Sequence, residues 1–274
     1  MRRFMIASLL CIATGATGAA AEDTGLESLV TRDAVRGWEA VGRLDIDGKG
    51  FCTASLIDEQ TVMTAAHCLF DSETGDRVDP ARMQFLAGLR DGQAMAYRGI
   101  RQAVAHPDYV LGDTADIGNI ASDVALLELD QPIRSTQIIP FEMGAEPQAG
   151  EAVGIVSYAQ ERAEVPSLQE VCTILGFQSE VLVMSCDVNY GSSGAPIFSL
   201  AGGQARIVSL VAAKAEIDTG RVALGMPIAA PNARIRGIME DGGGRFSGIA
   251  RTSIRVLRPG EGDTRETGAK FLRP

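Results

Sequence analysis

The chain has 274 residues and a formal net charge of −10 at pH 7. This acidity argues against nucleic acid and anionic membrane surfaces as partners, because both are polyanions. With 46% hydrophobic and 22% charged residues, the composition is that of a globular protein with a core filling one large domain or two small ones. The 31 glycines predict many turns between short strands.

The first 21 residues have the pattern of a secretory signal peptide. Arg2 and Arg3 precede an apolar run over residues 4–13, and small residues lead to an Ala-x-Ala site at residues 19–21. The apolar run is too short to span a bilayer, and no later stretch reaches the required length. We therefore expect cleavage after Ala21 and export to the periplasm or the extracellular medium, with no membrane span.

Four cysteines remain after this cleavage, an even number that suits an oxidising compartment. They allow three pairings, of which Cys52–Cys68 and Cys172–Cys186 are favoured because each closes a short local loop. Zinc binding is the alternative, but the chain has no C-x-x-C or H-x-x-x-H spacing. We expect neither a metal site nor a cofactor.

Residues 22–37 are polar and are predicted to be an N-terminal arm or a short propeptide. From Trp38 the pattern changes, and residues 39–46 alternate apolar and polar side chains as in a half-buried strand. Further strands are expected at residues 51–57, 61–64, 83–89, 94–104 and 124–129, with a loop at 113–120. Three prolines within residues 131–150 mark a connection, which divides the chain into domains at 38–140 and 141–241.

A second series of short strands is expected at residues 152–158, 168–177, 181–186, 195–200, 206–212 and 222–228. A short helix is expected near residues 231–239, and residues 242–274 are predicted to be a flexible tail. Many short strands with glycine turns and no alternating helices predict an all-β barrel or sandwich.

The candidate catalytic residues fall in three stretches. Ser193 lies in GSSGAP (191–196), on bent backbone that leaves its hydroxyl free, but a serine needs a base to act as a nucleophile. The chain has two histidines: His67 in TAAHC (64–68) and His106 in HPDY. Asp123 opens the strand-like run DVALLEL. The alternatives by position are Asp113, Asp116 and Asp130 for the carboxylate and Ser192 for the nucleophile.

In the order His, Asp, Ser, these stretches resemble the motifs TAAHC, DIALLxL and GDSGGP of the trypsin/chymotrypsin-type serine peptidases. The resemblance covers roughly residues 38–240 and is nearest to the compact bacterial members. It implies an all-β fold of two six-stranded antiparallel barrels, an active site in the cleft between them and a short C-terminal helix. It also implies an endopeptidase that acts on peptides or proteins, and we expect a monomer.

The resemblance assigns roles to matching residues. His67 would accept the Ser193 proton, and Asp123 would orient His67 and stabilise the imidazolium. The backbone N–H groups of Gly191 and Ser193 would bind the oxyanion. The pair Cys52–Cys68 also matches the family, whereas His106 matches a feature without a catalytic role.

Three positions bear on activation and specificity. Trypsin-like zymogens carry Asp where this chain has Ser192, so we predict no activation through an ion pair there. Asp187 matches the position of the trypsin pocket carboxylate, which predicts cleavage after basic residues; a structural role in a turn is the alternative. Ser209 would lie on the strand that pairs with the substrate backbone. No histidine follows Ser193, which argues against the pocket histidine of glutamate-specific relatives.

Two other functions are alternatives to an endopeptidase. The α/β-hydrolases take their histidine from after the nucleophile, and this chain has none there, so a lipase or esterase is excluded. The remaining alternative is a binding protein that keeps the peptidase fold without turnover.

Overall fold

The computed structural model describes residues 23–112, 116–218 and 220–241. The predicted signal peptide at 1–21 and the predicted tail at 242–274 lie outside these residues. The predicted arm at 22–37 is described from residue 23. Among the described residues, no helix has the length and apolar character needed to cross a membrane.

The first barrel is a closed antiparallel sheet of six strands. Its order is β2-β3-β4-β7-β6-β5, and every neighbouring pair is hydrogen-bonded. Its strands are β2 (Val41–Ile46), β3 (Gly50–Asp58), β4 (Thr61–Thr64), β5 (Met83–Ala87), β6 (Ala96–Ala105) and β7 (Ala125–Leu129).

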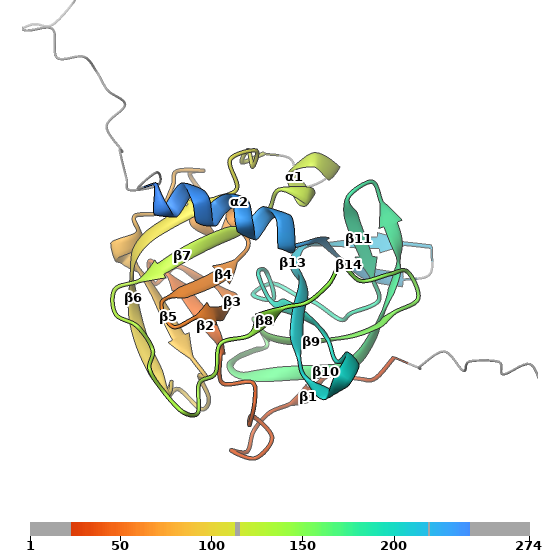
Figure 1. Cartoon of the computed structure of the whole chain (residues 1–274), viewed down its shortest axis with the longest axis horizontal. Coiled ribbons are helices and arrows are strands. Elements are labelled where there is room, and N and C mark those ends of the chain that lie inside the picture. Colours follow the sequence, from red (N-terminus) through yellow and green to blue (C-terminus); the bar gives the residue numbers. More distant parts are fainter. Residues whose placement is uncertain (1–22, 113–115, 219, 242–274) are drawn as a thin grey trace, which may run out of the picture.

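The second barrel closes in the same way, because β9 pairs with both β10 and β12. Its strands are β9 (Ala152–Ala159), β10 (Arg162–Gln178), β11 (Val181–Met184), β12 (Pro196–Ser199), β13 (Arg206–Ile217) and β14 (Gly220–Pro227). Two short strands extend this sheet: β1 (Glu27–Ser28) pairs with β10, and β8 (Glu142–Met143) pairs with β13. The two barrels lie side by side in Figure 1, so the predicted fold class is confirmed.

The helical elements are few. They are α1 (Ile117–Ala121), α2 (Ala229–Glu240) and the 3-10 turns η1 (Ala66–Leu69), η2 (Pro80–Arg82) and η3 (Ala201–Gly203). The prediction of loop for residues 113–120 is wrong at its end, because Asp116 caps α1 by accepting a hydrogen bond from the Gly118 N–H at 2.7 Å. The predicted C-terminal helix is α2, which follows the second barrel but packs on β6 and β7 of the first (Figure 1).

An aromatic cluster joins the N-terminal arm to both barrels. The ring of Phe198 on β12 is fully buried and lies 4.6 Å from Phe141 and 5.0 Å from Trp38 between ring centroids. Leu29 and Val35 of the arm are also buried. The arm therefore belongs to the packed body of the described protein.

Candidate active site

Two hydrogen bonds join Asp123 to His67 within the first barrel. The end of β4 leads into η1, which carries His67, while Asp123 stands just before β7. Asp123 Oδ1 accepts a hydrogen bond from the backbone N–H of His67 at 2.8 Å, and Oδ2 lies 2.7 Å from Nδ1 of the ring. The Asp123 side chain is 8% exposed and that of His67 is 29% exposed. One carboxylate thus fixes both the backbone and the ring, and Nε2 has no hydrogen bond to a described residue.

The described alternatives to Asp123 have other partners. Asp116 caps α1, and the side chain of Asp130 lies beside Gly99. Asp113 lies outside the described residues. Burial of the Tyr109 side chain and the charge of Asp123 both raise the pKa of Tyr109. Its hydroxyl therefore stays protonated near the carboxylate.

Two glycines make the turn around Ser193 possible. Gly191 has φ +95° and Gly194 has φ +76°, in the region that disfavours other residues. A Cβ on Gly191 would lie 2.4 Å from the Phe51 ring, and one on Gly194 would lie 2.1 Å from Thr64 Oγ1. These close approaches place the turn against the first barrel, and Ser193 lines the same cavity as His67.

Thr53 of the first barrel ties this turn down. Its Oγ1 donates to the Gly191 carbonyl at 2.8 Å and accepts from the Tyr158 N–H at 3.0 Å. Its N–H donates to the Ser193 carbonyl at 2.9 Å. Thr53 is fully buried, and sequence reasoning missed it because its partners lie more than 100 residues away.

The N–H groups of Gly191 and Ser193 are free for a ligand. Neither donates a hydrogen bond to another described residue, whereas Ser192 N–H donates to Asn189 O at 2.9 Å and Gly194 N–H to Val211 O at 2.7 Å. An oxyanion site needs backbone donors that no other group of the protein already uses.

Ser192 is fully buried and points away from the cleft. Its hydroxyl donates to the Tyr158 carbonyl at 3.3 Å and accepts from the Asn189 N–H at 3.3 Å. A neutral hydroxyl thus occupies the position where trypsin-like zymogens carry Asp, and the turn is closed without an ion pair at this residue.

His67 and Ser193 line one cavity of about 600 Å³ at the barrel interface. Its walls come from the β2–β3 hairpin, from residues 67–73 after the histidine, and from residues 190–193. The disulfide Cys52–Cys68 forms part of the wall, and Cys172–Cys186 lies in the second barrel, so both predicted pairings are confirmed. The sulfurs of Cys52 and Cys68 lie near the His67 ring, but a disulfide offers no thiolate to a metal.

Asp187 and Ser209 do not line this cavity. Asp187 is exposed, and its backbone N–H donates to Gln169 Oε1 at 2.7 Å. Burial lowers the pKa of Arg162, and the charges of Asp187 and Glu161 act against that shift, so Asp187 already has a cationic neighbour. Ser209 is fully buried, and its hydroxyl donates to the Leu210 carbonyl at 3.4 Å.

His106 lines a different cavity from His67 and Ser193. It is buried, its N–H donates to the Val124 carbonyl at 2.8 Å, and its Nδ1 accepts from the Asp108 N–H at 3.3 Å. These contacts fit the non-catalytic role that the sequence predicted for it.

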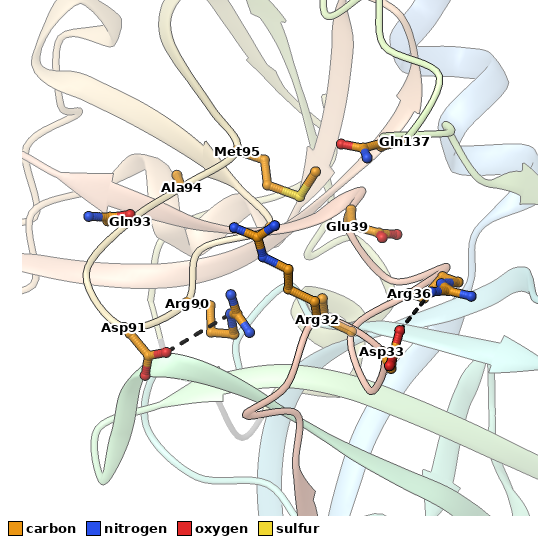
Figure 2. Close-up of a pocket in the computed structure, with 12 residues that line it drawn as sticks. Arg32, Asp33, Arg36, Glu39, Arg90, Asp91, Gln93, Ala94, Met95 and Gln137 are labelled. Atoms are coloured by element: carbon orange, nitrogen blue, oxygen red, sulfur yellow. Dashed lines mark hydrogen bonds and ion pairs between the residues drawn. The ribbon is translucent and has the colours of Figure 1, made fainter.

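A second cavity, of about 760 Å³, lies between the N-terminal arm and the loop after β5. Figure 2 shows Arg32 reaching into it toward Met95, with Arg90 and Arg36 at its sides. Arg36 pairs with Asp33 at 2.6 Å, and none of the candidate catalytic residues lines this cavity. It is therefore separate from the site of His67 and Ser193.

Comparisons with known proteins find peptidases among the relatives of this chain. The glutamyl endopeptidase of Bacillus licheniformis is 25% identical over 150 residues, which cover 54% of this chain and 45% of that protein. Human mannan-binding lectin serine protease 1 is 29% identical over 125 residues, covering 41% of this chain and 17% of that protein. Serine protease 23 of Rattus norvegicus is 27% identical over 192 residues, covering 57% and 49%. The chain spans less than half the length of each of these relatives.

A solved structure of a Glu endopeptidase in complex with MPD superposes with a TM-score of 0.61 at 16% identity, covering 82% of this chain and 99% of that one. At this identity the match supports the fold alone. The family model described as Trypsin matches residues 31–229, which is well over half of the chain. The chain therefore belongs to the trypsin family.

Proposed function

We propose that the protein is an exported serine endopeptidase that uses Ser193, His67 and Asp123 as a catalytic triad. The observation that carries this proposal is the doubly hydrogen-bonded His67–Asp123 pair in the cavity that Ser193 also lines. A monomer is sufficient, since one chain supplies both barrels and all three residues.

In the proposed reaction, Ser193 Oγ attacks the carbonyl carbon of the scissile peptide bond and His67 Nε2 takes the hydroxyl proton. The resulting oxyanion accepts hydrogen bonds from the N–H groups of Gly191 and Ser193. His67 then gives its proton to the leaving amine, and an acyl ester remains on Ser193. Water, deprotonated by His67, attacks this ester and regenerates the free serine.

Asp123 contributes by fixing one tautomer of His67. Because Oδ2 lies at Nδ1, the ring carries its proton there and presents an unprotonated Nε2 to Ser193. The buried carboxylate also stabilises the imidazolium that forms after the first proton transfer.

Export is proposed from two features that support each other. The pattern of residues 1–21 is that of a signal peptide, and the two disulfides require an oxidising compartment to persist. Periplasmic and extracellular destinations both meet this requirement.

Cleavage after basic residues stays a prediction that depends on Asp187. Its exposure and its position beside Arg162 weaken the prediction, because a substrate cation would have to compete with the guanidinium already there. A peptide library that varies the residue before the scissile bond tests it directly.

The same library tests the function. We expect the mature protein to cleave peptides within the library, Ser193→Ala to abolish cleavage, and Ser199→Ala, the same change outside the site, to retain it. Absence of cleavage in the folded wild-type protein, or equal cleavage by Ser193→Ala, would contradict the proposal.

A further inference from the structure

The catalytic cavity extends to one side of Ser193. No described residue of β13 lines it. Ala212 and Ala213 of β13 instead line a separate small cavity with Asp123. The family resemblance implies that β13, the strand of Ser209, pairs with the substrate backbone. With that part taken as the acyl side, the large cavity receives the leaving-group part of the peptide.

Most of the charge in this cavity is neutralised within the protein. Lys49 Nζ lies 2.8 Å from Asp71 Oδ2, and the N–H groups of Glu73 and Thr74 donate to Oδ1 of the same carboxylate. Lys49 and these two donors lower the pKa of Asp71 to about 2. Asp71 is therefore ionised at working pH and has its cation already.

A second acidic residue is also paired. Asp47 contacts Arg82 through an ion pair and lies 3.8 Å from Lys49. The remaining carboxylate is that of Glu73, which is exposed at the rim of the cavity. The Glu73 charge is the smallest of the causes that raise the pKa of Lys49, and Glu73 forms no ion pair with a described residue. The cavity thus has one unpaired negative charge.

The turn that carries Glu73 is well fixed. Asp71 N–H donates to the Asp76 carbonyl and Gly75 N–H donates to the Asp71 carbonyl, both at 2.8 Å. Together with the bond from the Glu73 N–H to Asp71 at 2.9 Å, these contacts hold the backbone of Glu73 at the rim. The backbone from which the Glu73 side chain extends therefore has a defined place at the rim.

Three aromatic rings contribute to the wall of the cavity that Ser193 and Glu73 also line. Phe51, Phe70 and Tyr190 all line the cavity. Cations of the protein already lie over two of these rings: Arg43 is 5.4 Å from the Phe51 centroid and Lys214 Nζ is 3.8 Å from that of Tyr190. The third ring, Phe70, packs against Tyr109 at 5.9 Å. A long aliphatic chain ending in a cation can pack along such faces while its charged end stays in water.

We propose that Glu73 selects a basic residue, lysine or arginine, within the first two positions after the scissile bond. The stem of that side chain packs on the aromatic wall, and its cation pairs with the Glu73 carboxylate. This inference rests on the proposed endopeptidase function and adds the substrate class of its leaving-group side.

An acyl-transfer experiment measures binding on the leaving-group side of Ser193 while the acyl part of the substrate is kept the same. A single peptide ester acylates Ser193, and an added dipeptide amide then competes with water. Its amine attacks the acyl carbon and passes a proton to His67, and Ser193 leaves with that proton. The amount of transfer product relative to hydrolysis measures binding of the nucleophile in the cavity.

The nucleophiles are Ala-Arg-amide and Arg-Ala-amide, with citrulline replacing arginine as an uncharged analogue of similar shape. For the position that Glu73 contacts, we expect arginine to exceed citrulline by up to about fivefold, the upper end of what an exposed ion pair contributes. The advantage should shrink as salt is raised, because both charges are exposed.

Two variants and a matched control make the test specific. Glu73→Gln should bring the arginine-to-citrulline ratio close to one, and Glu73→Lys should reverse it. Glu170→Gln, an exposed acid on β10 outside the cavity, removes the same charge and should leave the ratio unchanged.

The possible results distinguish failure of the Glu73 proposal from failure of the endopeptidase function. A ratio near one in the wild type, or a ratio that Glu73→Gln leaves intact, overturns the Glu73 proposal while the acyl-enzyme still supports the peptidase. If no acyl-enzyme forms in the wild type, the endopeptidase function fails and this inference fails with it.

Discussion

Asp123 holds His67 through two different groups, its backbone N–H and its ring nitrogen. The two bonds have different consequences. The bond to the backbone fixes the position of the ring, while the bond to Nδ1 fixes where its proton lies. A substitution that keeps the shape but changes the second bond separates these roles.

We predict that Asp123→Asn lowers kcat by about 10⁴-fold with little change in fold. The amide can still accept from the His67 N–H, but its NH₂ group can donate to Nδ1 and so stabilise the wrong tautomer. The measurement is steady-state hydrolysis of a peptide ester, with circular dichroism as the control for folding. Activity near that of the wild type would show that another carboxylate orients His67.

At the scale of single residues, the sequence was informative where a local motif carries the chemistry. His67, Asp123 and Ser193 each stand in a recognisable stretch. The glycines of GSSGAP predict a bent turn, and the positive φ angles of the structure agree with it. Thr53 had no such signal, because its role arises from contacts with Tyr158 and Gly191 across the barrel interface.

At the scale of elements, the corner between β6 and α2 joins the last helix to the first barrel. Arg234 of α2 makes two hydrogen bonds to Asp108, at 2.6 and 3.1 Å, beside the buried ring of His106. Burial is the main cause that lowers the pKa of His106; Arg234 adds to the shift and Asp108 opposes it. Glu146 and Glu180 line the same cavity.

This shift predicts that the free energy of unfolding decreases as the pH falls below 6.5, the ordinary pKa of histidine. In that window the unfolded chain binds a proton that the folded protein still excludes, so stability rises with pH. Denaturant midpoints between pH 8 and 5 measure the effect. Comparison with His106→Gln isolates this histidine from His67, and equal pH dependence in both proteins would contradict the prediction.

Element prediction worked best for strands with clear alternation and worst for short or paired features. α1 has five residues, too few for a helical period to be visible. The pairing of β1 with β10 joins residues that lie about 140 positions apart, and nothing local to residues 27–28 predicts that partner. Its consequence is that part of the predicted arm or propeptide is a strand of the second sheet.

At the scale of the whole molecule, the site exists because two closed barrels meet along one face. Thr53, Tyr158 and the aromatic cluster around Phe198 make that interface, and α2 spans back from the second barrel to the first. The six strands of each barrel were predictable from the sequence, unlike β1 and β8, but barrel closure was not. It came from the family resemblance, because closing a sheet depends on pairings between distant strands such as β9 with β12.

Specificity is likewise a property of the assembled molecule. Asp187 matched a known pocket position in the sequence, yet in the structure it is exposed beside Arg162. Glu73 carried no motif, and its charge stands out only after Lys49, Asp71 and their neighbours are paired in space.

The central claim is that His67 activates Ser193 in the folded, disulfide-intact protein. The most direct measurement is labelling of the mature protein with a fluorophosphonate, with the adduct located by mass spectrometry. We predict one label per molecule, on the peptide that contains Ser193, and loss of labelling in both Ser193→Ala and His67→Ala. A folded wild-type protein that takes no label, or one labelled equally without His67, would contradict the account and favour a binding protein that keeps the peptidase fold.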